Sequence, residues 1–295
     1  MQPAPGVLAR VPAPAIFVVS GLTQYLGAAL AVGLFAQIVP AGLAWLRLVV
    51  AALVLLAWRR PWRLHWSRHD LAVAALFGTA LGLMNVTFYV AISHLPLGTA
   101  VAIEFIGPVA VAAITGAGWR ERAGIAMAAV GVVLLAGVTL TLGGDDARIG
   151  LIAILAAAAC WAAYILLGRR VATTGDGVTR LSVAMTAGAL VLAPVVGRLG
   201  APVLGSWTLA VAVVGVAVLS SVIPYALEQV VLRRVSAATF AVLLALLPAT
   251  AALIGAVVLQ QWPHLLDVVG LVLVSGAIAL TSVRRRPSAP RGERS

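Results

Sequence analysis

The chain has 295 residues, of which 62% are hydrophobic and only 10% are charged, and its mean hydropathy is +1.09. Soluble domains carry about 25% charged residues, so this composition excludes a water-soluble particle of this size and predicts a protein embedded in a bilayer. The net charge of +11 comes from arginines in short connections between apolar segments, which argues against a nucleic-acid partner.

Breaks at prolines, glycines and arginine clusters divide the chain into ten segments long enough to cross a membrane, which takes about 17–25 mostly apolar residues. The first apolar run begins at Ala15 and lacks the pattern of a cleavable signal, so we expect a retained span. We therefore predict an all-α integral membrane protein. Its predicted spans cover residues 16–35, 41–58, 71–91, 97–116, 122–141, 150–167, 181–197, 207–232, 237–258 and 264–283.

The distribution of arginines predicts the orientation, because positively charged loops stay on the cytoplasmic side. With the N-terminus inside, seventeen of the 20 arginines fall in inside connections, and only Arg148 and Arg198 fall outside. We expect a multi-pass inner-membrane protein with cytoplasmic tails at 1–15 and 284–295. The second tail is rich in arginine and proline, which predicts contact with anionic membrane lipid.

The two halves of the chain resemble each other. A shift of 140 residues places the first five spans on the second five and Pro108 on Pro248. Because five is odd, the second copy is inverted in the membrane, an arrangement that recurs in secondary transporters. We predict two five-helix repeats, at 16–141 and 150–283.

Charged side chains inside a bilayer cost about 2.5–3.5 kcal/mol on insertion scales and usually face a cavity or a partner. Three fall within predicted spans: Arg47, Glu104 and Glu228. We predict that Glu104 and Glu228 bind substrate or a proton. For Arg47, a charge partner or substrate ligand and a merely structural, snorkelling residue stay equally open.

Other polar side chains extend these sites. Counted along the helices, Asn85 and Tyr89 belong with Arg47 and Glu104 to an outer group, about 9–10 Å below the outer boundary for the two charges. The inner group around Glu228 is completed by Tyr225, Trp161 and Tyr164. Anchoring at the membrane interface suits Trp161 and Tyr164 equally well.

Small and helix-breaking residues accompany the polar ones. Gly78 and Gly82 lie on the helix stripe of Asn85, where they predict close helix packing. Pro108 and Pro248 are candidate helix breaks, whose freed carbonyls could line a cavity. Simple kinks explain them as well.

Motifs of soluble enzymes are absent from the sequence: there is no phosphate-binding glycine loop and no cysteine–histidine metal pattern, and Cys160 is the only cysteine. We expect no metal and no cofactor. An enzyme acting on lipid intermediates needs several reactive groups converging near a membrane face, whereas the polar residues here are few and deep. A membrane scaffold without transport would leave Glu104 and Glu228 without a role.

Several segments carry a family resemblance, the most specific being PLGTAVAIEFIGP at 96–108. On these segments the chain resembles the drug/metabolite transporter superfamily with EamA-type repeats and, within it, the bacterial threonine/homoserine exporters, from about residue 16 to 283. The others are RPWRL at 60–64, MN and FY within 84–89, CWAAYIL at 160–166 and PYALE at 224–228.

This resemblance implies ten spans, cytoplasmic termini and export of a small polar metabolite such as an amino acid, with proton coupling left open. Efflux of cationic drugs or of nucleotide-sugar-like molecules by the same fold remains the alternative. The chain departs from the family at three ionisable positions. Val32 stands where the family tends to have lysine, Leu247 where it often has glutamate, and Gln260-Gln261 where a Gly-Glu pair often ends the ninth span. These departures leave the substrate and the coupling ion open.

Overall fold

The computed structural model describes residues 11–115, 118–171, 177–232, 234–235 and 237–282, and every regular element among them is a helix. Most of the two predicted tails, at 1–10 and 283–295, lies outside the described residues. In chain order the elements are α2 (Ala13–Leu34), α3 (Pro40–Arg59), η1 (Pro61–Arg63), α4 (Arg68–Ile92), α5 (Leu97–Glu104), α6 (Ile106–Thr115), α7 (Trp119–Val171), α8 (Gly177–Val196), η2 (Gly197–Gly205), α9 (Trp207–Ala217), η3 (Val218–Val222), α10 (Ile223–Leu232), α11 (Ala237–Leu243), η4 (Leu244–Leu246), α12 (Leu247–Val258) and α13 (Leu265–Ser282).

The surface of this helical bundle is apolar. Six helical stretches are long and apolar enough to cross a membrane, and four shorter apolar stretches accompany them. Large apolar side chains such as Ile114, Val195, Leu204 and Trp207 are exposed, at 76% or more of their surface. Soluble monomers rarely expose contiguous apolar patches of this kind. The outer surface therefore faces lipid.

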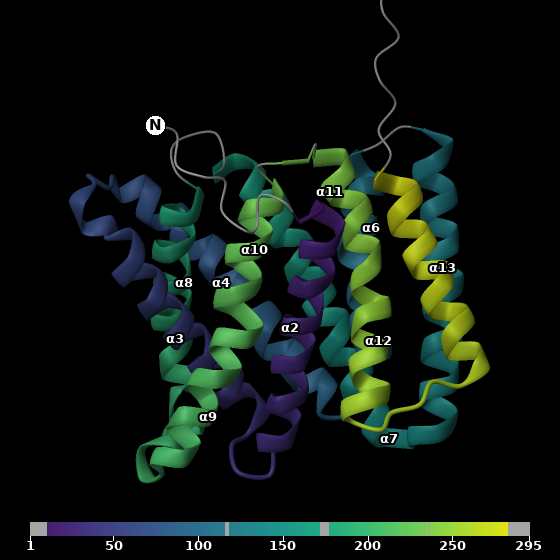
Figure 1. Ribbon diagram of the computed structural model, residues 1–295, viewed down its shortest axis with the longest axis horizontal. Helices are drawn as coiled ribbons and strands as arrows, with labels where there is room; N and C mark the ends of the chain where they lie inside the picture. The colour runs from purple at the N-terminus through teal and green to yellow at the C-terminus, as the bar shows by residue number, and fades with distance from the viewer. Residues whose placement is uncertain (1–10, 116–117, 172–176, 233, 236, 283–295) are drawn as a thin grey trace, which may run out of the picture.

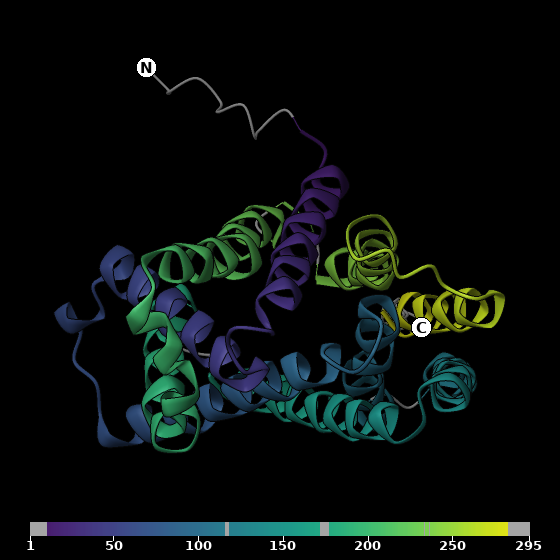
Figure 2. The same ribbon diagram turned by 90° about the horizontal axis from the view of Figure 1, so that it is seen from below.

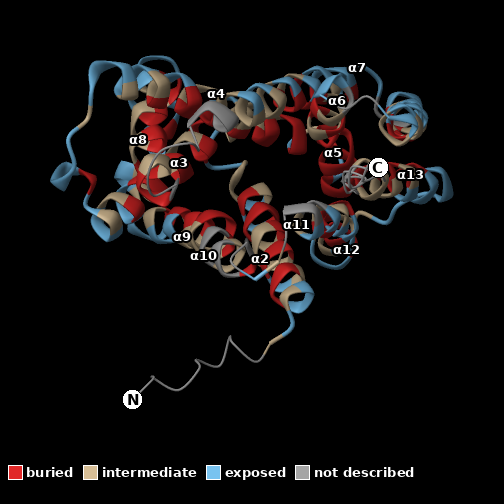
Figure 3. Ribbon diagram, turned by 90° about the horizontal axis from the view of Figure 1, so that it is seen from above, coloured by how far each residue is buried: buried red, intermediate tan, exposed pale blue. Residues whose placement is uncertain are grey.

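The helices form two rows with a closing helix at each end (Figures 2 and 3). One row contains α8, α4 and α7, and the other contains α9, α10, α2 and α12. At one end α3 packs against α8 and α4, and at the other α13 packs against α7. The buried faces of the helices point between the rows, so the interior available to a site lies there (Figure 3).

A sharp turn divides α7 into two helices. Gly144 has φ 56° and ψ −135° inside this element, a backbone conformation that glycine adopts without the steric cost of a Cβ. The turn lies between the predicted spans 122–141 and 150–167, and it is near the end of the bundle opposite the start of α2 (Figure 1).

Three of the predicted spans are interrupted. The span predicted at 97–116 breaks at Phe105, between α5 and α6, while 207–232 contains the π-helical turn η3 and 237–258 contains the 3-10 turn η4. Pro108 and Pro248 each lie in the first turn after an interruption, in α6 and α12. A first turn tolerates proline because its N–H groups have no partner within the helix.

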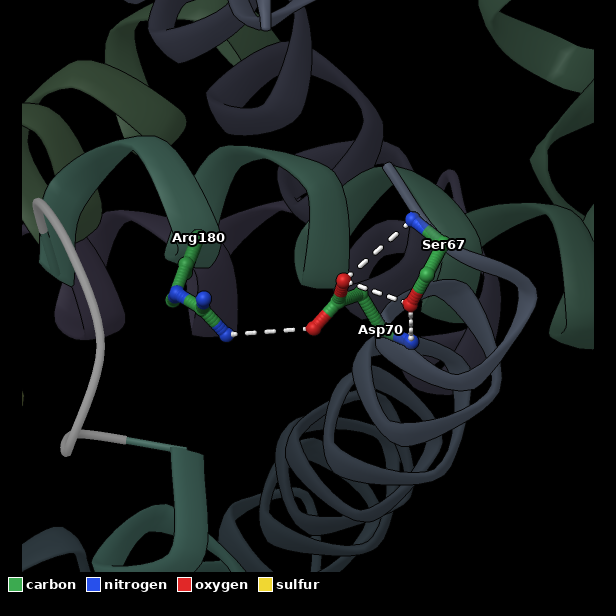
Figure 4. A network of polar contacts seen from close by, with 3 residues as sticks. All are labelled: Ser67, Asp70 and Arg180. Carbon is green, nitrogen blue, oxygen red and sulfur yellow. Dashed lines mark hydrogen bonds and ion pairs between the residues drawn. The ribbon is translucent and has the colours of Figure 1, made fainter. Parts of the chain in front are cut away.

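A capping box starts α4 (Figure 4). The Ser67 hydroxyl accepts a hydrogen bond from the backbone N–H of Asp70 at 3.0 Å, and the Asp70 carboxylate accepts one from the backbone N–H of Ser67 at 3.2 Å. The same carboxylate lies 3.8 Å from Arg180 of α8. These reciprocal bonds fix the helix start, and the ion pair ties it to the neighbouring helix.

Glycines allow α4 and α8 to approach closely, as the stripe through Gly78 predicts. A Cβ on Gly78 would collide with the carbonyl of Ala184, and a Cβ on Gly188 would collide with the carbonyl of Gly78. A Cβ on Gly82 would lie 2.5 Å from Leu192 Cδ1. The predicted close packing is therefore confirmed, and it holds the two helices of one row together.

We expect Gly78→Ala to destabilise the folded protein by about 1–3 kcal/mol, because an added methyl group in a closed contact forces the backbones of α4 and α8 apart. The measurement is the thermal midpoint of aggregation in detergent, followed by size-exclusion chromatography. Gly215→Ala is the matched control, since nothing lies within 4 Å of a Cβ at that position. Equal midpoints for the two variants would contradict the packing argument.

Candidate functional site

Glu104 is the last residue of α5 and lies immediately before the break at Phe105. Its side chain is 8% exposed and belongs to a helix whose eight residues are all buried. Within the described part of the chain its carboxylate has no hydrogen-bond or ion-pair partner, yet its oxygens are not sealed from water. A carboxylate so placed needs either a proton or a cationic partner.

Arg47 of α3 is held by an aromatic residue of α4. Its Nη1 donates a hydrogen bond to the Tyr89 hydroxyl at 3.3 Å, and its guanidinium carbon lies 4.8 Å from the centroid of the Tyr89 ring. The Tyr89 ring is itself fully buried and lies edge-on to Phe35, with 6.0 Å between centroids. This cation–π contact positions the guanidinium in the interior and leaves some of its N–H groups available.

Arg47 and Glu104 are close without forming an ion pair. Among the described residues no nitrogen of Arg47 lies within 4.0 Å of a Glu104 oxygen, although the Arg47 charge is close enough to act on the Glu104 carboxylate. The structure therefore presents two opposite charges that are separated. A ligand carrying both signs of charge could bridge them.

Glu228 of α10 contacts the first helix. The Ser20 hydroxyl lies 3.4 Å from Glu228 Oε1 and also 3.4 Å from the carbonyl oxygen of Pro224. Ser20 is 1% exposed, so this polar contact lies inside the bundle between α2 and α10.

Tyr25 lies within electrostatic range of both carboxylates, and the sequence analysis missed it. It lies one and a half turns after Ser20 on α2, it is 4% exposed, and both Glu104 and Glu228 are close enough to act on its hydroxyl. The available signal was a tyrosine within an apolar span. The helix that carries Tyr25, α2, packs directly against α10, which carries Glu228, and against α12, which in turn packs against α5 with Glu104.

The other predicted site residues differ in how close they lie to Glu104 and in whether they serve helix packing. Trp161 packs edge-on against Phe105, with 4.7 Å between ring centroids, so it adjoins the break after Glu104. Tyr164 stacks on Phe77 at 4.5 Å, and this contact serves packing between α7 and α4. Asn85 is buried, and its amide donates to the carbonyl of Leu81 in its own helix at 2.7 Å, which leaves its oxygen for a ligand. The side chain of Tyr225 lies outside the described residues.

At two of the three positions where the chain departs from the family, the side chain packs against apolar neighbours. Leu247 is buried where α12 meets α2, and a Cβ on Gly21 would lie 3.0 Å from its Cδ2. Val32 packs against the main hydrophobic core. At the third position a polar contact remains, since Gln261 Oε1 accepts a hydrogen bond from the backbone N–H of Leu97 at 2.9 Å. Among the described residues, the ionisable groups around Glu104 are therefore Arg47, Glu228 and the tyrosines near them.

Comparison with known proteins decides the family. Residues 148–283 match the EamA-like transporter family. The chain is 34% identical over 266 residues to the threonine/homoserine exporter RhtA of Salmonella typhimurium, covering 88% of each protein. It is 32% identical over 289 residues to the threonine/homoserine exporter RhtA of Escherichia coli K12, covering 95% of this chain and 96% of that protein.

The chain belongs to the EamA-like transporter family. The predicted resemblance to EamA-type members of the drug/metabolite transporter superfamily is thereby confirmed. A solved crystal structure has the same fold, with a TM-score of 0.53 and 19% identity over 90% of this chain and 96% of that one. Together with its apolar helices, family membership makes the chain a multi-pass inner-membrane protein.

We expect Tyr25→Phe to reduce transport by the EamA-like protein at least about tenfold while leaving its thermal stability unchanged. The substitution keeps the ring and removes only the hydroxyl, which has no hydrogen-bond partner in the described part of the chain but lies near both carboxylates. A hydrogen bond to a charged group is worth about 1.5–3 kcal/mol, enough for such a loss.

Thr87→Val is the control for Tyr25→Phe, because the Thr87 hydroxyl is bonded only to the backbone of its own helix. Uptake into vesicles and thermal midpoints are measured for both variants. Normal transport by Tyr25→Phe would remove Tyr25 from the site.

Proposed function

We propose that this EamA-like protein is a secondary transporter that exports threonine, homoserine or a related small amino acid. The observation that carries the proposal is Glu104, a buried carboxylate at a helix break with no partner in the described part of the chain. A transporter needs such a group, because a charge that the protein does not neutralise is available to a ligand or a proton. The similarity to threonine/homoserine exporters over most of the chain names the substrate class.

The separated charges suit a zwitterion. The ammonium group of an amino acid would bind Glu104, and its carboxylate would bind the guanidinium of Arg47, which Tyr89 holds in place. The hydroxyl of Tyr25 and the free oxygen of Asn85 would contact the polar side chain. Trp161, next to Phe105, would supply an apolar wall.

Proton exchange would use the same groups. Glu228 and Glu104 both lie within electrostatic range of the Tyr25 hydroxyl. A buried carboxylate that loses the substrate ammonium group could take up a proton in its place. Cationic drugs are the substrates that this arrangement would favour if Arg47 did not contact the ligand, because two carboxylates would then surround the site. Transport is the proposed activity, and no enzymatic reaction is part of it.

The proposed topology has ten spans in two inverted repeats, at 16–141 and 150–283, with both termini in the cytoplasm. Six long and four shorter apolar helical stretches support this number of spans. The arginine distribution supports the orientation, since the outside connections would contain only Arg148 and Arg198. Lipid would surround the exposed apolar faces.

Glu104→Gln keeps the shape of the side chain and removes its charge. We expect the variant to insert and fold normally but to lose most transport, at least about a hundredfold if a buried ionic contact to the substrate ammonium is broken, which typically costs 3–5 kcal/mol. The measurement is exchange of radiolabelled amino acids in reconstituted vesicles, with a substrate panel and with or without a pH gradient.

Glu121→Gln is the matched control for this charge removal, since Glu121 lies in the first turn of α7, away from the site. A structural role for Glu104 gives a different result. Glu104→Gln would then lower protein abundance by stranding Arg47, and a second change, Arg47→Gln, would restore it. A well-folded Glu104→Gln protein with wild-type transport would contradict both roles.

Cysteine labelling tests the topology. After replacement of Cys160 by alanine, single cysteines at Pro40 and Ala201 should react with a membrane-impermeant maleimide in whole cells, because both positions lie in predicted outside connections. A cysteine at Arg68 should react only after the cells are opened. The reverse pattern would show that the proposed orientation is wrong.

A further inference from the structure

A cavity of about 370 Å³ lies away from Glu104, at the other end of α5. It is lined by the α4–α5 connection, the first turn of α5, α7, α12, the connection between α12 and α13, and the start of α13. This connection is at the end of the bundle opposite the start of α2 (Figure 1). In the proposed topology the cavity opens to the outside.

Asp267 places a negative charge in this cavity. It is 7% exposed, and its Oδ2 accepts a hydrogen bond from the backbone N–H of His264 at 2.9 Å, which caps the start of α13. Its Oδ1 has no partner in the described part of the chain. The cap explains why an acidic residue stands at this helix start, but it uses only one of the two oxygens.

The first turn of α5 supplies hydrogen-bond donors to the same cavity. Pro96 precedes the helix and provides no side-chain cap, so the backbone N–H groups of Gly98 and Thr99 lack the partner that a cap would offer. Both residues line the cavity. The Thr99 side chain is 5% exposed, and its hydroxyl has no hydrogen-bond partner among the described residues. The positive end of the α5 dipole lies here as well.

No arginine lines the described cavity. Of its two histidines, His94 is engaged through its ring Nδ1, which contacts Asp146 at 2.7 Å, and His264 contributes its backbone N–H to Asp267. A buried carboxylate oxygen on one side and free N–H groups on the other remain for a ligand. We propose that this cavity is a second binding site for a small zwitterion, with the ammonium group on Asp267 and the carboxylate at the start of α5.

Gln261 shapes this second site. Its Oε1 accepts the hydrogen bond from the Leu97 N–H at 2.9 Å, which ties the α12–α13 connection to α5. Glutamate at this position would place a second negative charge beside the helix start and would compete for the ligand ammonium group. The neutral amide preserves the tether and leaves Asp267 as the acidic group of the cavity lining.

Trp262 reports on the cavity, because it lines it. Wild-type protein and Trp262→Phe, both in phosphatidylcholine nanodiscs at one fixed pH, are titrated with L-threonine, ethanolamine and acetate, and the difference in tryptophan fluorescence is the readout. L-Threonine should bind more tightly than either single-charge compound. L-Threonine is chosen as the first probe because of the proposed function. The charges that line the cavity are observed independently of that function.

Asp267→Asn keeps an oxygen for the helix cap and removes the charge, so the protein should still fold. We expect this substitution to weaken the binding of L-threonine and of ethanolamine at least about tenfold and to leave the binding of acetate unchanged. Thr99→Val, which leaves the cap untouched, should weaken L-threonine severalfold. Asp145→Asn is the matched control, because Asp145 is an exposed acid that pairs with Arg148 and lies outside the cavity lining.

Glu104→Gln separates this proposal from the proposed transport site: the Trp262 signal should persist in that variant even if its transport is lost. The ammonium could also come from a lipid headgroup. Adding phosphatidylethanolamine to the nanodiscs would then lower the apparent affinity for L-threonine, and Asp267→Asn would abolish this difference, which supports the same ammonium site. Absence of a Trp262-dependent signal in either lipid, or wild-type affinity in Asp267→Asn, would overturn it.

Discussion

A peptide group without a hydrogen-bond partner is costly in hydrocarbon, so a chain in a bilayer can leave helical geometry only where protein surrounds the break. This chain leaves regular α-helix within apolar segments at Phe105, at η3 and at η4. Phe105 is fully buried, and η3 contains the buried Ser220 and Ser221. A Cβ on Gly27 would lie 2.8 Å from the backbone nitrogen of Ser220, so α2 approaches this irregular turn closely.

The interrupted segments therefore gather around α2. This helix packs against η3, α10 and α12, and α12 in turn packs against α5. On α2, the Ser20 hydroxyl contacts Glu228 of α10, and Tyr25 lies within electrostatic range of both Glu104 and Glu228. The need to satisfy backbone hydrogen bonds thus also determines where the candidate site lies. The breaks must be buried, and the place where they are buried is also where Glu104 and Glu228 are brought near each other.

Much of the fold can be predicted from the sequence, because a membrane-spanning helix must be apolar and hydropathy along the chain measures this property directly. Each predicted span corresponds to helix in the structure, and α2 begins only three residues before the predicted start at residue 16. The interruptions could not be located in this way. Pro108 marks the region of one, but the break itself lies at Phe105, because a proline is accommodated in the first turn of the helix that follows.

The site could be predicted less completely, and particular residues show why. Arg47, Glu104 and Glu228 stand out because charges are rare in apolar spans. Tyr25 and Ser20 do not, since a tyrosine or serine in a membrane helix is equally compatible with lipid-facing or packing roles. Nor does the sequence show that Asn85 donates to its own helix or that Tyr164 stacks on Phe77. Such facts depend on which face a neighbouring helix covers.

The short helix α5 joins the two sites proposed for this protein. Thr99, which lines the cavity, and Glu104 are five residues apart on this helix, a rise of about 7.5 Å at 1.5 Å per residue. Every residue of α5 is buried, and the helix is held at its start by Gln261 and packed between α12 and α7. A helix of this length moves as a rigid body. A displacement that opens the interior around Glu104 must therefore also change the cavity that Asp267 lines, and a ligand that binds more tightly to one arrangement of α5 would bias both sites.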